Sequence, residues 1–317
     1  MNERAKRRDM GSAATGQTRE RLRSVVVPLD FTSSSDRVLG RIALLPLAHD
    51  ARVTLLHVVP RTLSPEDQRR AQRDAKKSLA QEARHLARSL PKAVELEHAV
   101  KVGAAFKEIA AFARSAKAEL VVMGRGGGRA IRDHFLGSTA ERVIRQAQLP
   151  VLVVRLAARA AYSRPAIAVD FDKAAHEVVG LAARLFEPQR LRMAVIHAFS
   201  PPYENLAYPS IPEAALHERR RQCQLEASHK LTKLLAASLA KAGVPPGEAP
   251  LWKLMVRYGS PRTVIAKTAE QTESDVLVLG THGYAGLAHV FLGTVAGDVL
   301  REVTCDVLVV PPAASTK

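Results

Sequence analysis

One stretch of the sequence occurs twice, and its glycines restrict what the chain around it can fold into. In each copy an apolar run of four residues ends at a glycine, a second glycine follows three residues later, and a third follows ten residues after that. The glycines are Gly124, Gly127 and Gly137 in the first copy, and Gly280, Gly283 and Gly293 in the second. Every position is offset by 156 residues, so the chain carries an internal repeat.

Each copy predicts a buried strand, a glycine loop and the start of a helix. Hydroxyl residues follow the third glycine, with Ser138 and Thr139 in the first copy and Thr294 in the second. Glycine lets a backbone approach a ligand closely, and the free N–H groups at a helix start attract an anion. The pattern therefore predicts a site for the phosphates of a nucleotide in each copy.

The rest of the chain alternates strands with helices, which predicts an α/β fold with parallel sheets. A first strand ends at Asp30, a helix is expected from Thr32 through about His49, and a second strand over 52–59. Asp170 and His197 repeat Asp30 and His57 at an offset of 140. Since the glycines are offset by 156, we expect a net insertion of 16 residues in the second copy, within 200–212.

Length and composition narrow the class of protein. The 317 residues suit two domains, and 47% apolar residues are ample for their cores. Only two cysteines occur, Cys223 and Cys305, so we expect no disulfide framework and no metal site. No apolar run is long enough to span a bilayer, and the amino terminus lacks a secretory signal, so we expect a cytoplasmic protein and no membrane partner.

The net charge of +16 brings acidic partners into consideration. Residues 1–22 are basic and poor in apolar side chains, which predicts a disordered tail. Much of the remaining charge falls on long helices, where a solvated face explains it. Aromatic residues make up only 4% of the chain, which disfavours a nucleic-acid groove, although binding through the basic tail and helices remains an alternative.

The glycine motifs and the ends of the expected strands resemble those of the universal stress protein family. The features that match are the glycine motif, the openings Val27-Pro-Leu-Asp30 and Ala168-Val-Asp170, and the endings at 149–155 and 305–311. The resemblance implies two tandem, doubly wound, Rossmann-like domains over 23–155 and 164–311. Each would hold a five-stranded parallel sheet in the order 3-2-1-4-5 with helices on both faces. The halves would pack as the family's dimer does, through their final strands, and two such chains could pair as a homodimer.

The resemblance also implies a ligand, ATP with or without Mg²⁺, and residues that bind it. The acid after the first strand would contact the adenine or ribose, and the residue after the second strand's histidine would contribute its backbone. The residues that match the family's binding positions are Asp30, Val58, Gly124, Gly127, Gly137, Ser138 and Thr139, and then Asp170, Ala198, Gly280, Gly283, Gly293, Thr294 and Val295.

Several alternatives stay open. Asp30 and Asp170 could simply cap helices, and His57 and His197 fit buried, hydrogen-bonded side chains better than ligands. No Gly-Lys-Ser or Gly-Lys-Thr follows a glycine loop, and no nucleophile with a base is placed nearby, so we expect a regulatory, stress-response module without efficient catalysis. Slow ATP hydrolysis is one alternative. Another is a scaffold with degenerate pockets that acts through an unidentified protein partner.

Overall fold

The structure is a computed structural model, and it describes residues 21–126, 137–172, 174–186, 192–200, 212–245, 247, 249–281 and 292–313. The expected tail, except for residues 21 and 22, and the expected insertion at 201–211 lie outside these ranges. So do Gly127 and Gly283.

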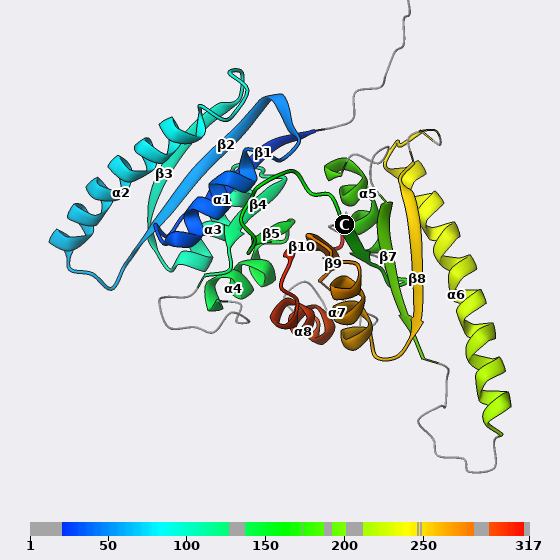
Figure 1. Cartoon of the computed structure of the whole chain (residues 1–317). Coiled ribbons are helices and arrows are strands. Elements are labelled where there is room, and N and C mark those ends of the chain that lie inside the picture. Colours follow the sequence, from blue (N-terminus) through cyan, green and yellow to red (C-terminus); the bar gives the residue numbers. More distant parts are fainter. Residues whose placement is uncertain are drawn as a thin grey trace, which may run out of the picture.

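Strands and helices alternate along both halves of the chain (Figure 1). The first half contains β1 (Leu22–Pro28), α1 (Ser33–Ile42), β2 (Leu47–Pro60), α2 (Pro65–Leu86), β3 (Glu95–Gly103), α3 (Ala105–Ser115), β4 (Leu120–Gly124), α4 (Ser138–Ala147) and β5 (Val151–Val154). The second contains β6 (Pro165–Ala168), α5 (Ala175–Leu185), β7 (Arg192–Phe199), α6 (Glu213–Lys241), β8 (Leu251–Tyr258), α7 (Pro261–Gln271), β9 (Val276–Gly280), α8 (Thr294–Glu302) and β10 (Asp306–Val310). The expected α/β class is confirmed.

All ten strands belong to one sheet, in the order β3-β2-β1-β4-β5-β10-β9-β6-β7-β8. Read from each outer edge inward, both halves follow the order 3-2-1-4-5. Neighbouring strands within each half are parallel, whereas β5 and β10 are antiparallel, with Leu152 opposite Leu308. The final strands therefore join the two halves, as the resemblance implies.

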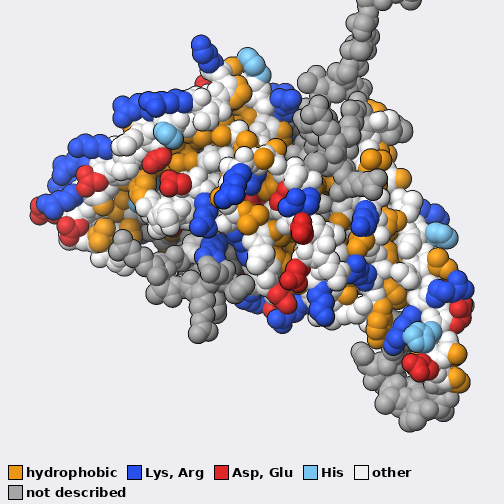
Figure 2. Space-filling model, viewed as in Figure 1, with side chains coloured by type: hydrophobic (Ala, Val, Ile, Leu, Met, Phe, Trp, Pro, Cys, Tyr) orange, Lys and Arg blue, Asp and Glu red, His pale blue; other side chains and the backbone are white. Residues whose placement is uncertain are grey.

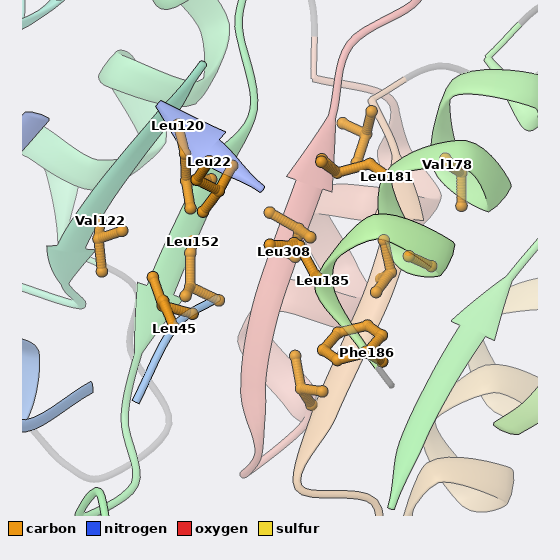
Figure 3. Packing of buried hydrophobic residues seen from close by; sticks show 14 of the residues in the cluster. Leu22, Leu45, Leu120, Val122, Leu152, Val178, Leu181, Leu185, Phe186 and Leu308 are labelled. Carbon is orange, nitrogen blue, oxygen red and sulfur yellow. The ribbon is translucent and has the colours of Figure 1, made fainter. Parts of the chain in front are cut away.

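Helices cover both faces of this sheet. The core on one face combines side chains of α1, α2, α5 and α6 with alternate strand residues, and α3, α4, α7 and α8 cover the opposite face. Because strand side chains alternate between faces, Leu308 and Val307 of β10 lie in different cores. Figure 3 shows Leu152 and Leu308 on adjacent strands, so the packing continues from one half into the other.

The first helix is shorter than the sequence pattern suggests. We expected it to run to about His49, but α1 ends at Ile42 and β2 begins at Leu47. Pro46 explains the difference, because the residue before a proline is disfavoured in a helix. The Pro46 carbonyl instead accepts a hydrogen bond from the Leu22 N–H at 3.1 Å, which starts the pairing of β1 with β2.

Candidate functional site

The two glycine motifs lie at the carboxyl ends of β4 and β9. Their neighbours in the sheet, β1 and β6, end two residues before Asp30 and Asp170 respectively. In each half the strand order reverses between these two neighbouring strands, β1 and β4 in the first half and β6 and β9 in the second. Ligands of doubly wound sheets bind in the crevice at this reversal, so each half presents one such position.

The same backbone hydrogen bond closes both glycine loops. The Gly137 N–H donates to the Arg125 carbonyl, and the Gly293 N–H donates to the Thr281 carbonyl, each at 2.7 Å. A Cβ on Gly137 would lie 2.7 Å from the Arg125 carbonyl oxygen, so no larger residue fits there without moving backbone. Gly126, beside this contact, has a φ of +69°, which also favours glycine.

Both loops lead directly into a helix whose start has no side-chain cap. Gly137 and Gly293 are the N-cap residues of α4 and α8, and neither helix start has a side-chain cap hydrogen bond within the described chain. The first N–H groups of a helix have no acceptor within it, and they carry the positive end of the helix dipole. These two helix starts can therefore receive an anion.

The second half holds a cavity of about 620 Å³. Its walls bring together the acid after β6, the end of β7, the end of β9 and the start of α8. The residues assigned to this half that line the cavity are Asp170, Ala198, Gly280, Gly293, Thr294 and Val295. All the assigned residues that the structure describes in this half therefore surround one space.

The first half holds a cavity of only about 170 Å³. Four of its assigned residues line this cavity, namely Asp30, Val58, Gly124 and Thr139. Gly137 and Ser138 lie at the start of α4 but are not among the lining residues. Sites for small molecules and cofactors have volumes of about 300–1,000 Å³, so the second cavity is in that range and the first is below it.

Side-chain size explains part of this difference. At four equivalent positions the first half has the larger residue, and at two, Ala105 against Pro261 and Thr139 against Val295, it has the smaller. The four larger residues and their counterparts are Pro28 and Ala168, Leu29 and Val169, Ser35 and Ala175, and Val58 and Ala198. In addition, the Ser34 hydroxyl lies 2.8 Å from the place where a Cβ on Gly124 would be, so Ser34 covers that glycine.

The two aspartates are held differently. Oδ1 of Asp30 accepts hydrogen bonds from the N–H and hydroxyl of Thr32 at 3.1 and 2.7 Å, and from the Ser35 hydroxyl at 3.5 Å. The turn before α1 therefore engages Asp30.

In the second half, Asp172 instead caps α5, by accepting from the N–H groups of Ala174 and Ala175. Asp170 accepts from the N–H of Phe171 at 2.8 Å. Neither aspartate is the N-cap of a helix, because Thr32 caps α1 and Asp172 accepts from the first N–H groups of α5. Asp30 is engaged by its own turn, which leaves Asp170 the better placed to contact a ligand.

The two equivalent histidines are hydrogen-bonded to backbone, as expected. Nδ1 of His57 lies 2.7 Å from the Leu29 carbonyl oxygen, and Nδ1 of His197 lies 2.9 Å from that of Val169. Both rings also line the cavities.

Each histidine ring packs against a phenylalanine that the sequence analysis did not single out. The centroids of Phe31 and His57 lie 4.6 Å apart, and those of Phe171 and His197 lie 4.5 Å apart. Both phenylalanines directly follow the two aspartates that the internal repeat relates, which is the signal that could have identified them.

The described part of the chain offers neither a metal site nor a membrane-spanning helix. It contains no group of three or more His, Cys, Asp or Glu side chains arranged to hold a metal ion. Among its helices, none combines the length and apolar character needed to cross a membrane.

The fold and its crevices define a duplicated α/β protein with a ligand pocket at the reversal of strand order. The model of the universal stress protein family matches residues 21–155 and again 162–311. The chain therefore belongs to the universal stress protein family and carries two copies of its domain.

Individual relatives agree with this assignment. Universal stress protein Sll1388 from Synechocystis is 31% identical over 157 residues, which cover 47% of this chain and 97% of the relative. A universal stress protein from Thermus aquaticus is 30% identical over 144 residues, covering 45% of this chain and 95% of the relative. Both relatives thus match about one half of the chain.

Solved structures match the whole arrangement. A universal stress protein from Archaeoglobus fulgidus has a TM-score of 0.62 at 16% identity, and the match covers 91% of this chain and 96% of that one. A putative universal stress protein from Pseudomonas aeruginosa has a TM-score of 0.56 at 19% identity, with 92% and 94% covered. At these identities the likeness is evidence for the fold alone.

Proposed function

We propose that the chain binds an adenine nucleotide, ATP with or without Mg²⁺, in the cavity of its second half. The observation that carries this proposal is the gathering of six assigned residues around one cavity of about 620 Å³. The uncapped start of α8 would hold the phosphates, and Asp170 would accept hydrogen bonds from the ribose or base. Apolar side chains such as Ile265 and Leu279 line the same cavity and would pack against the base.

The first half supports nucleotide binding less well. Its cavity is below the usual size of a ligand site, and Asp30 is engaged by Thr32 and Ser35. We therefore propose one working site per chain. The first half then serves as a scaffold. It pairs with the second half through β5, and its own pocket is degenerate.

We further propose that binding proceeds without efficient turnover. The polar side chains around the second cavity mainly stabilise the fold, because His197 is bonded to the Val169 carbonyl and Asp172 caps α5. A nucleotide that orders the site would make the chain a regulatory module in a stress response.

A matched pair of variants tests the site. Titration calorimetry with ATP should show that Asp170→Asn weakens binding by about tenfold or more, because a hydrogen bond to a charged group contributes about 1.5–3 kcal/mol. Asp30→Asn is the matched control at the equivalent position, and it should leave the affinity unchanged. Equal losses in both variants, or no heat from the unaltered protein, would contradict the proposal.

A further inference from the structure

The positive charge of the chain is concentrated in its first half. Residues 1–155 contain 29 Lys and Arg against 16 Asp and Glu, whereas residues 156–317 contain 18 against 15. Composition alone does not show where this excess lies, and an excess spread evenly over a surface needs no partner. The structure shows where part of it is gathered.

One helix, α2, presents a row of exposed cations, which we call the α2 ridge. Its members are Arg70, Arg73, Lys77 and Arg84. They recur at spacings of three, four and seven residues, so they share one helix face over a length of about 21 Å. The opposite face is buried through Ala75, Leu79 and Leu86, so the ridge points directly away from the sheet.

No member of the α2 ridge takes part in an ion pair within the described ranges. Arginines elsewhere do, such as Arg52 with Glu95 at 3.1 Å and Arg262 with Glu302 at 2.8 Å. Like charges at these helix spacings cost a few tenths of a kcal/mol per pair, and Glu66 and Asp74, each four residues from Arg70 on the same face, offset part of this cost. An anionic partner would relieve this repulsion.

The equivalent helix of the second half, α6, has a mixed surface. Arg221 pairs with Glu218 at 2.8 Å, Lys241 pairs with Glu177 at 2.8 Å, and Arg220 lies over the Tyr258 ring. Figure 2 shows Lys and Arg side chains following the upper left edge over α2, with acidic side chains at its left end, and mixed colours over α6 at the lower right. What distinguishes the α2 ridge is therefore the row of cations without ion pairs among the described residues, and not the net charge of the helix.

We propose that the α2 ridge binds the phosphate backbone of double-stranded nucleic acid without reading its sequence. Regularly spaced cations on a straight helix can neutralise phosphates and release their counterions. An α-helix with side chains is about 10–12 Å wide, which is the width of the major groove of DNA. No aromatic side chain interrupts the ridge, so bases of a single strand would find nothing on which to stack.

A membrane surface fits the ridge less well. Helices that lie in a membrane interface present large apolar side chains beside their cations. In α2 the large apolar side chains Leu79 and Leu86 face the core instead. This site is also separate from the proposed nucleotide cavity, because it lies in the other half of the chain.

The test uses the full chain and a fluorescein-labelled duplex of about 20 base pairs with mixed sequence, followed by anisotropy across a salt series. The ridge variant carries Arg73→Gln, Lys77→Gln and Arg84→Gln. The control carries Arg219→Gln, Lys230→Gln and Lys233→Gln, which remove three exposed cations from α6. Glutamine keeps a high helix propensity, and unchanged melting temperatures would show that both variants are folded.

We expect the ridge variant to bind on the order of tenfold more weakly at low salt, and its plot of log K against log salt to be shallower by about three. The control variant should keep most of the affinity and slope. Equal effects of the two variants would overturn the proposal, as would binding that survives in the ridge variant but disappears on deletion of residues 1–20. Preference for phosphatidylserine vesicles over the duplex would overturn it in favour of a membrane.

Discussion

Asp306 of β10 and Arg41 of α1 form a buried ion pair between the two halves of the chain. Oδ2 of Asp306 lies 3.4 Å from Nε of Arg41, and the side chains are 0% and 4% exposed. The Tyr162 hydroxyl donates to the same carboxylate at 2.6 Å, and the N–H groups of Arg155 and Leu156 donate at 2.7 and 2.8 Å. This single carboxylate therefore holds α1, the linker and the last strand together.

Removing this carboxylate should destabilise the protein strongly. Asp306→Ala leaves the Arg41 guanidinium buried without its partner, which typically costs about 3–5 kcal/mol. Asp50→Ala is the control, because Asp50 pairs with Arg23 where both side chains are about 70% exposed, and such pairs contribute about 0–1 kcal/mol. Urea unfolding measures both changes, and similar losses in the two variants would show that the buried pair is not a main connection.

Stability should fall at alkaline pH because of a buried thiol beside this pair. Burial raises the pKa of Cys305 from 9.0 to about 12. Between pH 9 and about pH 12 the thiol ionises in the unfolded chain but not in the folded one. The free energy of unfolding therefore falls by up to about 1.4 kcal/mol per pH unit. Burial likewise raises the pKa of Tyr162 well above 10.0, which adds to the loss at higher pH.

Cys305→Ala should make this decline shallower, as measured by urea unfolding at pH values from about 8 to about 10.5. In the Cys223→Ala background, where Cys305 is the remaining thiol, a thiol reagent should react slowly at about pH 9 while the protein is folded and rapidly after unfolding. An unchanged slope in Cys305→Ala, or rapid reaction of the folded thiol, would contradict this assignment.

A third prediction concerns the size of the second cavity. Ala198→Val introduces the residue that the first half has at the equivalent position, Val58. We expect ATP affinity to fall by about 5- to 100-fold, because overpacking a fitted site costs about 1–3 kcal/mol. The reverse change, Val58→Ala, should enlarge the first cavity without altering affinity at the second. If Ala198→Val binds ATP as tightly as the unaltered protein, side-chain size at this position does not limit binding.

A fourth prediction concerns the glycine that closes the first loop. Gly137→Ala places a Cβ 2.7 Å from the Arg125 carbonyl oxygen and 2.9 Å from the carbonyl carbon of Gly126. Backbone must move to relieve this contact, so we expect a loss of about 1–3 kcal/mol in unfolding free energy. Gly247→Ala is the control, since an added Cβ there meets nothing within 4 Å. Equal stabilities of the two variants would show that the loop adjusts freely.

Local patterns were enough to predict the order of the elements and most of the residues that line the two cavities. Apolar runs ending at Gly124 and Gly280 predicted strands, and parallel strands place their carboxyl ends at one edge of a sheet. This is why Asp170 and Thr294, more than 120 residues apart, could be expected to line the same cavity. The end of α1 was also marked in the sequence by Pro46.

The difference between the two sites could not be predicted from the motifs. Cavity volume depends on many lining side chains together, and single exchanges such as Pro28 against Ala168 have no obvious meaning before the residues are known to be neighbours. The aspartates looked equivalent because both follow a first strand. Their hydrogen bonds differ because Thr32 and Ser35 engage Asp30, whereas Asp170 accepts from the N–H of Phe171.

The central claim is that one half of the chain binds the nucleotide, and a direct count tests it. Purified protein is saturated with ATP, freed of excess ligand by rapid filtration and denatured, and the released adenine nucleotide is measured per chain. We predict about one nucleotide per chain for the unaltered protein and for Asp30→Asn, and far less for Asp170→Asn. About two nucleotides per chain, none at all, or a loss caused by Asp30→Asn alone would contradict it.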